Sequence, residues 1–247
     1  MGIPDSGVGA ARLSAADLAA ITTYGAKAAW PGGFTVYQRG APADGVFVVL
    51  RGRVVLRSRV KAGRGFVPAV ATVGETFGTE GLTTAARYVT DAKADEPSET
   101  LHLSGARFRA FVREQPQHAL ALIGQVMAER TALLEKLREL ATLSVEERLI
   151  AAMLRMNEQN QFADGHRLTL GPAQYRLLCE LVGATRESVS LVFNRLVSAG
   201  LVERDGTTYV VTDAPALGAR LGGGFTETEV PLSVNSETKG MGRAVQA

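Results

Sequence analysis

The chain has 247 residues, of which 46% are hydrophobic and 21% charged, so it can build one large core or two modest domains. Its 27 Lys and Arg residues against 25 Asp and Glu residues give a formal charge of +2, which by itself indicates neither a nucleic acid nor a membrane. One cysteine excludes a disulfide framework, a Cys-rich zinc site and a Cys-ligated iron–sulfur cluster within the chain. Three scattered histidines argue against a multi-His metal site, so we expect no metal.

The sequence carries no signal for a membrane or for export. No apolar run approaches the roughly 20 residues of a membrane span, and the N-terminus lacks the basic and apolar regions of a signal peptide. We therefore expect a cytoplasmic protein without a membrane partner. Residues 1–10 and 214–247 contain glycines and no apolar stripe, which predicts a disordered N-terminal tail and a flexible, Gly-rich C-terminal tail.

The strand candidates between residues 31 and 103 are short and are separated by glycines. They cover residues 34–37, 46–50, 54–56, 66–73 and 101–103. Many short strands between glycine turns are typical of an antiparallel sandwich or barrel. The segment Arg51-Gly52-Arg53 predicts a tight hairpin between the second and third of these strands.

The pattern changes near Phe108 to that of a long helix. Residues 117–143 contain no proline and one glycine, and apolar residues recur there at spacings of three and four. One small β domain cannot bury such a stripe completely, so we expect two chains to pair along this helix as a homodimer. The alternative is a helix that covers a large sheet of its own chain. The expected dimer interface consists of Ile123, Met127, Arg130, Leu134, Leu137 and Ala141.

A further helix is predicted to begin after Ser144. Ser144 and Glu147 have the spacing of a capping box, in which hydroxyl and carboxylate accept from free N–H groups of the first turn. The apolar face of this helix would consist of Leu149, Ile150, Met153 and Leu154, and residues 163–165 predict a turn beyond it.

Residues 175–194 read as two helices that meet at a tight turn. Gly183 stands where the turn requires a positive φ, and the small Cys179 stands where the helices cross closely. Thr185 is placed to cap the second helix, whose inner face would be Val189, Val192, Phe193 and Leu196. A hairpin with its turn at residues 205–206 follows, so the segment predicts a winged helix-turn-helix. The alternative is an ordinary helical hairpin on a small domain.

The outward face of the second helix suits the major groove of double-stranded DNA. Arg186 can pair with guanine O6 and N7, and Glu187 can accept from cytosine N4. Recognition helices read bases chiefly from their N-terminal residues. The candidate DNA-contacting residues are Thr185, Arg186, Glu187, Ser190, Leu191 and Asn194, with Gln174, Arg176 and Arg195 as further contacts.

The charge of this region opposes the DNA-binding interpretation. Residues 144–213 contain seven Arg and no Lys against nine Asp and Glu, so their formal charge is 7 − 9 = −2. Affinity for phosphates requires local basicity and not net charge. Arg167, Arg176, Arg195 and Arg204 would therefore have to gather on one face.

Residues 30–213 resemble the CRP/FNR superfamily of bacterial transcription regulators. The resemblance depends on the segment 38–54, on Gly74-Glu-Thr-Phe-Gly78, on the long helix and on the segment 183–190, Gly-Ala-Thr-Arg-Glu-Ser-Val-Ser. It implies an α+β fold: an N-terminal antiparallel β jelly roll of the cyclic-nucleotide-binding type over 11–113, a dimerisation helix over 114–143 and a C-terminal winged helix-turn-helix over 144–213. It also implies a homodimer on a near-palindromic operator, RNA polymerase as a candidate partner, and no enzymatic activity.

The resemblance assigns a candidate effector site to Gly78, Thr79, Glu80, Arg87, Tyr88, Leu133 and Leu134. Three of its features depart from the family pattern. Thr79 stands where the family has an acid that holds a ribose hydroxyl, and Tyr88 replaces a small hydroxyl residue beside the phosphate arginine, Arg87. Leu133 and Leu134 replace a polar pair that meets the base. We therefore expect no control by ordinary cAMP, and the sequence identifies no cofactor.

Several alternatives stay open on the sequence. One is a cyclic-nucleotide-dependent regulator that uses Arg87 as phosphate ligand, and others are regulation by a different small-molecule effector or by none. A protein of another class, a regulatory cyclic-nucleotide-binding subunit acting on a protein partner, would leave the winged helix unexplained. A cupin enzyme would need clustered His and Glu ligands, but His102 stands alone in the β region.

Overall fold

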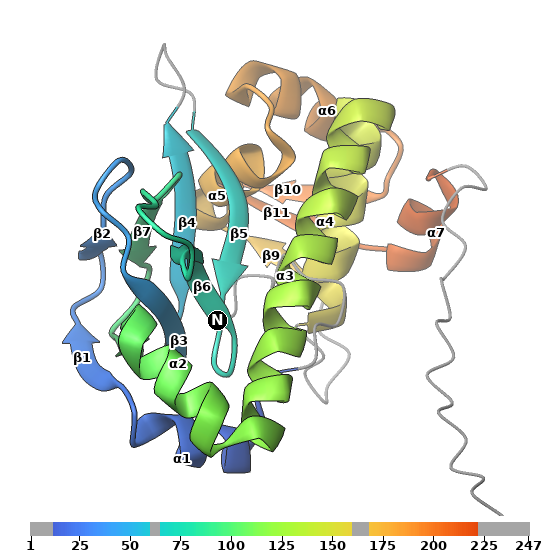
Figure 1. Cartoon of the computed structure of the whole chain (residues 1–247). Helices are drawn as coiled ribbons and strands as arrows, with labels where there is room; N and C mark the ends of the chain where they lie inside the picture. The colour runs from blue at the N-terminus through green and yellow to red at the C-terminus, as the bar shows by residue number, and fades with distance from the viewer. Residues whose placement is uncertain (1–11, 60–64, 160–167, 222–247) are drawn as a thin grey trace, which may run out of the picture.

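The computed structural model describes residues 12–59, 65–159 and 168–221. A β-sandwich forms the N-terminal domain, a long helix leaves it, and a smaller domain of helices with a short sheet forms the C-terminal part (Figure 1). The turn predicted at residues 163–165 and the predicted tails at 1–10 and beyond 221 lie outside these residues.

Eight strands form two four-stranded antiparallel sheets, which confirms the predicted antiparallel β domain. One sheet has the order β1-β8-β3-β6 and the other the order β2-β7-β4-β5. The strands are β1 (Ala26–Trp30), β2 (Thr35–Tyr37), β3 (Gly45–Arg51), β4 (Val54–Arg59), β5 (Gly65–Ala71), β6 (Thr76–Gly81), β7 (Asp91–Ala94) and β8 (Ser98–Leu103).

The prediction of a hairpin at Gly52 is wrong. β3 pairs with β6 and β8, whereas β4 pairs with β5 and β7, so the chain crosses from one sheet to the other at this point. Gly52 has φ +76°, and a Cβ there would lie 2.5 Å from Ser98 Oγ and 2.6 Å from the carbonyl oxygen of Pro97. Glycine is therefore required for a close crossing, a need that the local sequence does not distinguish from a turn.

Three helices close one end of the sandwich. They are α1 (Ala15–Thr22), α2 (Gly105–Glu114) and the start of α3 (Pro116–Thr142). Ile21, Phe111 and Leu122 bury their side chains against Val46 and Leu101 of the sheet. The sequence interpretation missed α1, which begins with a capping box between Ser14 and Asp17 and has one fully buried residue.

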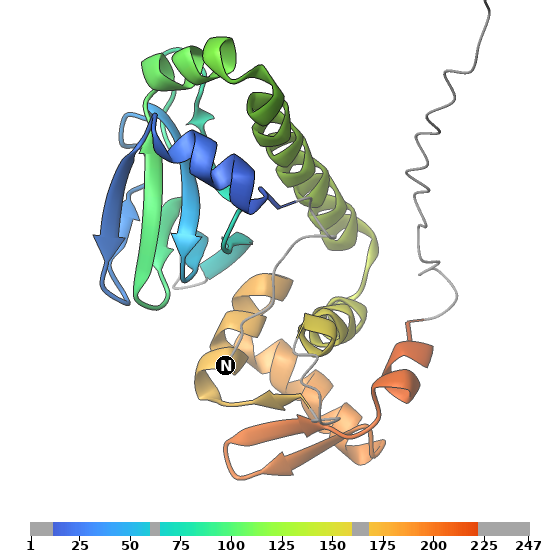
Figure 2. The same cartoon turned by 90° about the horizontal axis from the view of Figure 1, so that it is seen from below.

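The long helix predicted over 117–143 is confirmed as α3, which runs from the sandwich to the C-terminal domain (Figure 2). Its first half turns Ala119, Leu122 and Gln125 inward. The large apolar side chains on its other face are exposed: Leu120, Ile123, Met127, Leu133, Leu134 and Leu137.

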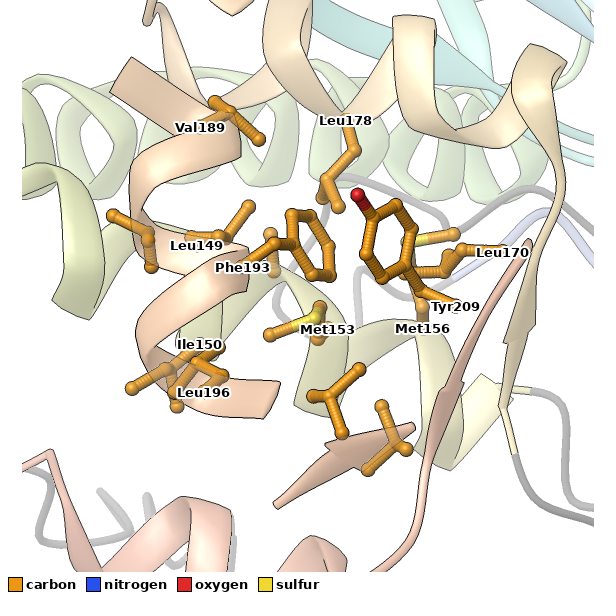
Figure 3. Packing of buried hydrophobic residues seen from close by; sticks show 14 of the residues in the cluster. Leu149, Ile150, Met153, Met156, Leu170, Leu178, Val189, Phe193, Leu196 and Tyr209 are labelled. Carbon is orange, nitrogen blue, oxygen red and sulfur yellow. The ribbon is translucent and has the colours of Figure 1, made fainter. Parts of the chain in front are cut away.

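The C-terminal domain contains α4 (Val145–Gln159), α5 (Pro172–Val182), α6 (Arg186–Ser198) and the sheet of β9 (Thr169–Leu170), β10 (Val202–Asp205) and β11 (Thr208–Val211). The predicted capping box is confirmed: the Ser144 N–H donates to Glu147 Oε2 at 2.7 Å and the Glu147 N–H donates to Ser144 Oγ at 3.2 Å. In the core, the rings of Phe193 and Tyr209 stack at 4.2 Å between Leu178 and Met153 (Figure 3).

The flexible tail was predicted to begin at residue 214, but a helix occupies its first residues. α7 (Ala214–Ala219) continues the domain, with Leu217 fully buried in the same core. The Asp213 carboxylate accepts from the Ala216 N–H at 2.9 Å and caps this helix. One buried leucine in six residues gives no periodicity, so the sequence pattern could not reveal it.

α5 also connects the two domains. Leu177 and Leu181 pack on Val55, Val67 and Val70 of the β4–β5 pair. The face that carries Leu178 and Val182 belongs instead to the core of the C-terminal domain. α5 is therefore apolar on two faces, one for each domain.

Candidate nucleic-acid interface and effector site

The turn between α5 and α6 has the geometry that the sequence predicts. Gly183 lies in the left-handed region with φ +64° and ψ +36°. The Ala184 N–H donates to the Cys179 carbonyl at 3.1 Å, which closes the end of α5. Cys179 is buried, and burial raises its pKa to about 11, so the residue acts as a small packing group and not as a reactive thiolate.

The predicted cap and inner face of α6 are confirmed. Thr185 Oγ1 accepts from the Ser188 N–H at 3.2 Å and so begins the helix one residue before Arg186. The four buried residues of α6 are those named from the sequence, Val189, Val192, Phe193 and Leu196. Their packing fixes which side chains of α6 point outward.

The outward face of α6 carries the predicted base-reading groups. Arg186, Glu187, Leu191 and Asn194 are exposed, and Leu191 exposes 65% of its surface although it is a large apolar residue. Ser190 and Thr185 are half-buried. This face thus presents a guanidinium, a carboxylate, an amide and an apolar side chain, which are groups that discriminate bases in the major groove.

The arginines expected to gather on one face do not all lie together. Arg195 forms an ion pair with Glu146 of α4 at 3.2 Å, and nine residues separate it from Arg186, which puts the two on opposite sides of the helix. Arg204 lies on the β10–β11 wing, where its guanidinium stands 5.7 Å from the Tyr209 ring. Arg167 lies outside the described residues.

The residues predicted on the preceding helix have different surroundings. Arg176 of α5 is exposed, whereas Gln174 is half-buried. The amide oxygen of Gln174 lies so near the start of α5 that a Cβ on Gly171 would meet it at 3.0 Å. The β10–β11 hairpin, with its turn at Gly206, confirms the predicted wing.

Aromatic side chains fill the interior of the sandwich beside the candidate effector site. Tyr88 is buried and stacks on Tyr37 at 3.7 Å, and the Phe47 and Phe77 rings lie 5.0 Å apart next to them. A Cβ on Gly78 would meet three of these rings at 3.1 to 3.2 Å. Tyr88, which stands where the family has a small hydroxyl residue, therefore contributes to the packing of the domain.

The remaining candidate effector residues are only partly brought together. Glu80 Oε1 accepts from the Val89 N–H at 3.2 Å. The exposed Arg87 donates to the Gly40 carbonyl at 2.7 Å. Leu133 and Leu134 expose 41% and 53% of their surfaces on α3.

The sequence interpretation missed one residue of this region, Glu129 of α3. Burial raises its pKa to about 7, and the charge of Glu80 acts in the same direction. The hydroxyls of Thr76 and Thr79 lie close to its carboxyl group. A glutamate four residues after Gln125, on the inward face of an amphipathic helix, was the available signal.

Among the described residues, no group of three or more His, Cys, Asp and Glu is arranged to hold a metal ion. No helix in that part of the chain is both long and apolar enough to cross a membrane.

Comparison with known proteins agrees with this architecture. A model of the cyclic nucleotide-binding domain matches residues 29–115, and one of the Crp-like helix-turn-helix domain matches residues 147–220. The chain is 23% identical over 212 residues to a CRP-like cAMP-activated global transcriptional regulator of Mycobacterium tuberculosis, covering 82% of this chain and 91% of that protein. It is also 23% identical over 186 residues to the cAMP-activated global transcriptional regulator CRP of Pasteurella multocida, covering 74% and 88%. In fold it is similar to the c-di-GMP responsive global regulator CLP of Xanthomonas campestris, with TM-score 0.68, 20% identity and coverage of 81% and 100%.

A sandwich of the cyclic-nucleotide-binding type, a long connecting helix and a Crp-like winged helix-turn-helix define a DNA-binding transcription regulator. Such regulators are transcription factors and not enzymes. This chain belongs to the CRP/FNR family.

Proposed function

We propose that two copies of the chain pair along α3 and place their α6 helices in successive major grooves of a near-palindromic operator. The observation that carries this proposal is the combination of two exposed faces. α3 presents an apolar stripe to solvent, and α6 presents exposed arginine, glutamate, leucine and asparagine side chains. The rest of the described chain leaves both faces exposed.

The α3 stripe supports the pairing. Exposed large apolar residues recur at 120, 123, 127, 134 and 137, which is the spacing of a coiled-coil seam. The predicted interface residues Arg130 and Ala141 are exposed on the same face. Apolar patches of this extent on soluble proteins mark interaction sites, and a second copy offers the same stripe in the matching register.

We further propose that the regulator does not respond to ordinary cAMP. The pocket region contains the stacked Tyr37 and Tyr88, and its acidic groups Glu80 and Glu129 oppose a phosphate. Arg87, the cation that would bind the phosphate, already donates to a backbone carbonyl. Contact with RNA polymerase is a further proposal, drawn from the family alone.

Selection of duplexes from a random pool tests this function. The full chain, at modest ionic strength, is expected to enrich sites with two symmetric halves one helical turn apart and to sediment as a dimer. Addition of 1 mM cAMP is expected to change the affinity less than tenfold, which corresponds to about 1.4 kcal/mol. A monomer that enriches no sequence would contradict the proposal, and a larger gain with cAMP would contradict the interpretation of the pocket.

A further inference from the structure

A cluster of buried oxygens lies between α3, β6 and β2, and the proposed DNA-binding function does not use it. Four side-chain oxygens in the described part of the chain are buried there without a well-formed hydrogen bond: Tyr37 OH, Thr76 Oγ1, Gln125 Oε1 and Glu129 Oε2. The hydroxyls nearest to them are those of Thr76 and Thr79 beside Glu129 and that of Thr90 beside Tyr37. Tyr37, Thr76 and Gln125 are at most 8% exposed. Buried polar atoms in folded proteins almost always have partners, so these four mark a place that can accept N–H or O–H donors.

These groups lie together in space. The Glu129 carboxyl is close to Thr76, and its charge and that of Glu80 act on the Tyr37 hydroxyl. Gln125 stands one turn before Glu129 on the inward face of α3. Thr79 and Glu80, at the end of β6, are half-buried and form the rim.

The charge at this cluster is negative. Glu75 and Glu80 contribute carboxylates, and Glu129, whose pKa is about 7, contributes a third above neutral pH. Of the nearby cations, Arg12 lies 3.6 Å from Glu75, and Arg87 is exposed and bonded to the Gly40 carbonyl. A phosphate would meet like charge here, whereas a cation would meet opposite charge at low effective dielectric constant.

The surroundings favour an organic cation over a metal ion. The charge of Glu80 acts on the hydroxyls of Tyr37 and Tyr88, whose rings stack on each other, so aromatic rings lie near the carboxylates. Aromatic rings attract ammonium and guanidinium groups. No metal-holding group of three His, Cys, Asp or Glu occurs in the described ranges. Amide and hydroxyl oxygens can accept the several N–H donors that such a cation carries.

We propose that this cluster binds a small organic cation with an ammonium or guanidinium group, paired to Glu129 and Glu80 and held by the oxygens of Gln125, Thr76 and Tyr37. This inference rests on the proposed function, because it names the class of effector for that regulator. Glu129 lies on the helix that carries the dimer stripe, so a bound cation joins α3 to β6 and connects the site to the dimer face.

Titration calorimetry of the full chain with agmatine tests the proposal, at pH 8 and at constant ionic strength set with KCl. We expect one agmatine per chain and a rise in Tm. Glu129→Gln should weaken binding at least tenfold. Glu135→Gln is the matched control, because Glu135 lies on the same helix but is paired with Arg138 at 2.8 Å; it should bind as the wild type does. Thr76→Val keeps the side-chain shape but removes the hydroxyl. If Glu129→Gln does not fold, Thr76→Val replaces it as the test variant and should also weaken agmatine binding.

Two results would overturn the proposal. Equal binding to the Glu129→Gln and Glu135→Gln variants would show surface association only, and a Tm that responds to pH but not to agmatine would show that the carboxyl takes only a proton. Operator binding is measured on the same preparation without agmatine. Operator binding without an agmatine response rejects this site alone, and an agmatine response without operator binding rejects the DNA-binding proposal alone.

Discussion

Two single side chains, Arg186 and Glu129, are central to the proposed DNA-binding site and the proposed effector site. Arg186 is exposed at the first turn of α6, where a helix N-terminus enters the major groove in proteins of this architecture. Its position is held by the Thr185 cap and by the buried face behind it. Glu129, by contrast, is a half-buried residue of α3 with one buried carboxylate oxygen.

Arg186→Ala should remove operator selectivity while the dimer persists. A bidentate arginine–guanine contact contributes about 1 to 3 kcal/mol of discrimination, so specific affinity should fall at least several-fold while non-specific binding changes less. Competition gel shifts against a scrambled duplex measure this, with Arg176→Ala as the control for a general loss of phosphate contacts. Retained selectivity in Arg186→Ala would refute the base-reading role.

The stability of the free protein should fall as the pH rises from about 4.5 to about 7. The pKa of Glu129 in the folded chain is about 7, against an ordinary value of 4.5, because burial and the charge of Glu80 disfavour the carboxylate. A raised pKa means that the folded chain binds the proton more tightly than the unfolded chain. Its stabilising effect is therefore complete below pH 4.5 and is lost between there and pH 7.

Urea unfolding at pH 5.5 and pH 8, with Glu129→Gln beside the wild type, measures this dependence. The variant has no proton to lose, so its unfolding free energy should change less between the two pH values. A wild-type and variant difference that is the same at both pH values would contradict the assignment.

At the scale of elements, α3 has one face buried against the sandwich and one face exposed to solvent. Its inward face packs on the sandwich through Ala119 and Leu122, while the stripe around Leu134 faces solvent. Burial of apolar surface stabilises association by roughly 25 cal/mol for each Å² removed from water. In the proposed dimer, the stripe is therefore the part of α3 whose energy depends on a second chain.

Leu134→Glu should separate the dimer, because two carboxylates would meet in an apolar seam. Sedimentation equilibrium measures the mass, and operator affinity should fall with it because each half-site then binds alone. Phe34→Glu, at an exposed apolar residue between β1 and β2, is the matched control and should stay dimeric. An unchanged mass for Leu134→Glu would disprove the seam.

At the scale of the whole molecule, the two domains are packed against each other. Leu177 and Leu181 of α5 cover valines of β4 and β5, and Arg57 forms an ion pair with Glu180 at 3.3 Å beside them. Arg148 donates to the Val182 carbonyl at 3.0 Å and to the Leu143 carbonyl at 2.9 Å. These contacts fix the winged helix relative to the sandwich and to the end of α3.

Leu177→Asp should undock the winged helix without unfolding it. The charge would lie between the domains, and the core of the C-terminal domain on the other face of α5 would remain. Small-angle scattering should show a larger radius of gyration with unchanged helical circular dichroism. Leu178→Asp, one residue along but in that core, should instead unfold the domain. A compact Leu177→Asp protein would show that the interdomain contact is not needed.

The sequence by itself determined the order of the three main parts, which are the β domain, the long helix and the winged helix, and most of the outward face of α6. Periodicity of 3.6 residues, a capping box at Ser144 and a glycine at 183 are local features, and local geometry follows from them. The outward residues of α6 were assigned correctly because a helix with one buried face has only one face left.

Only the tertiary structure decided which strands pair, which face of α5 meets which domain, and what surrounds Glu129. Gly52 looks the same in a hairpin and in a crossing, since both need a positive φ. Leu177 and Leu178 are the same apolar residue type, yet they bury their side chains against different domains. Burial and the proximity of Glu80 and Glu129, 49 positions apart in the chain, arise only when distant segments meet, and these contacts determine the charge of the site.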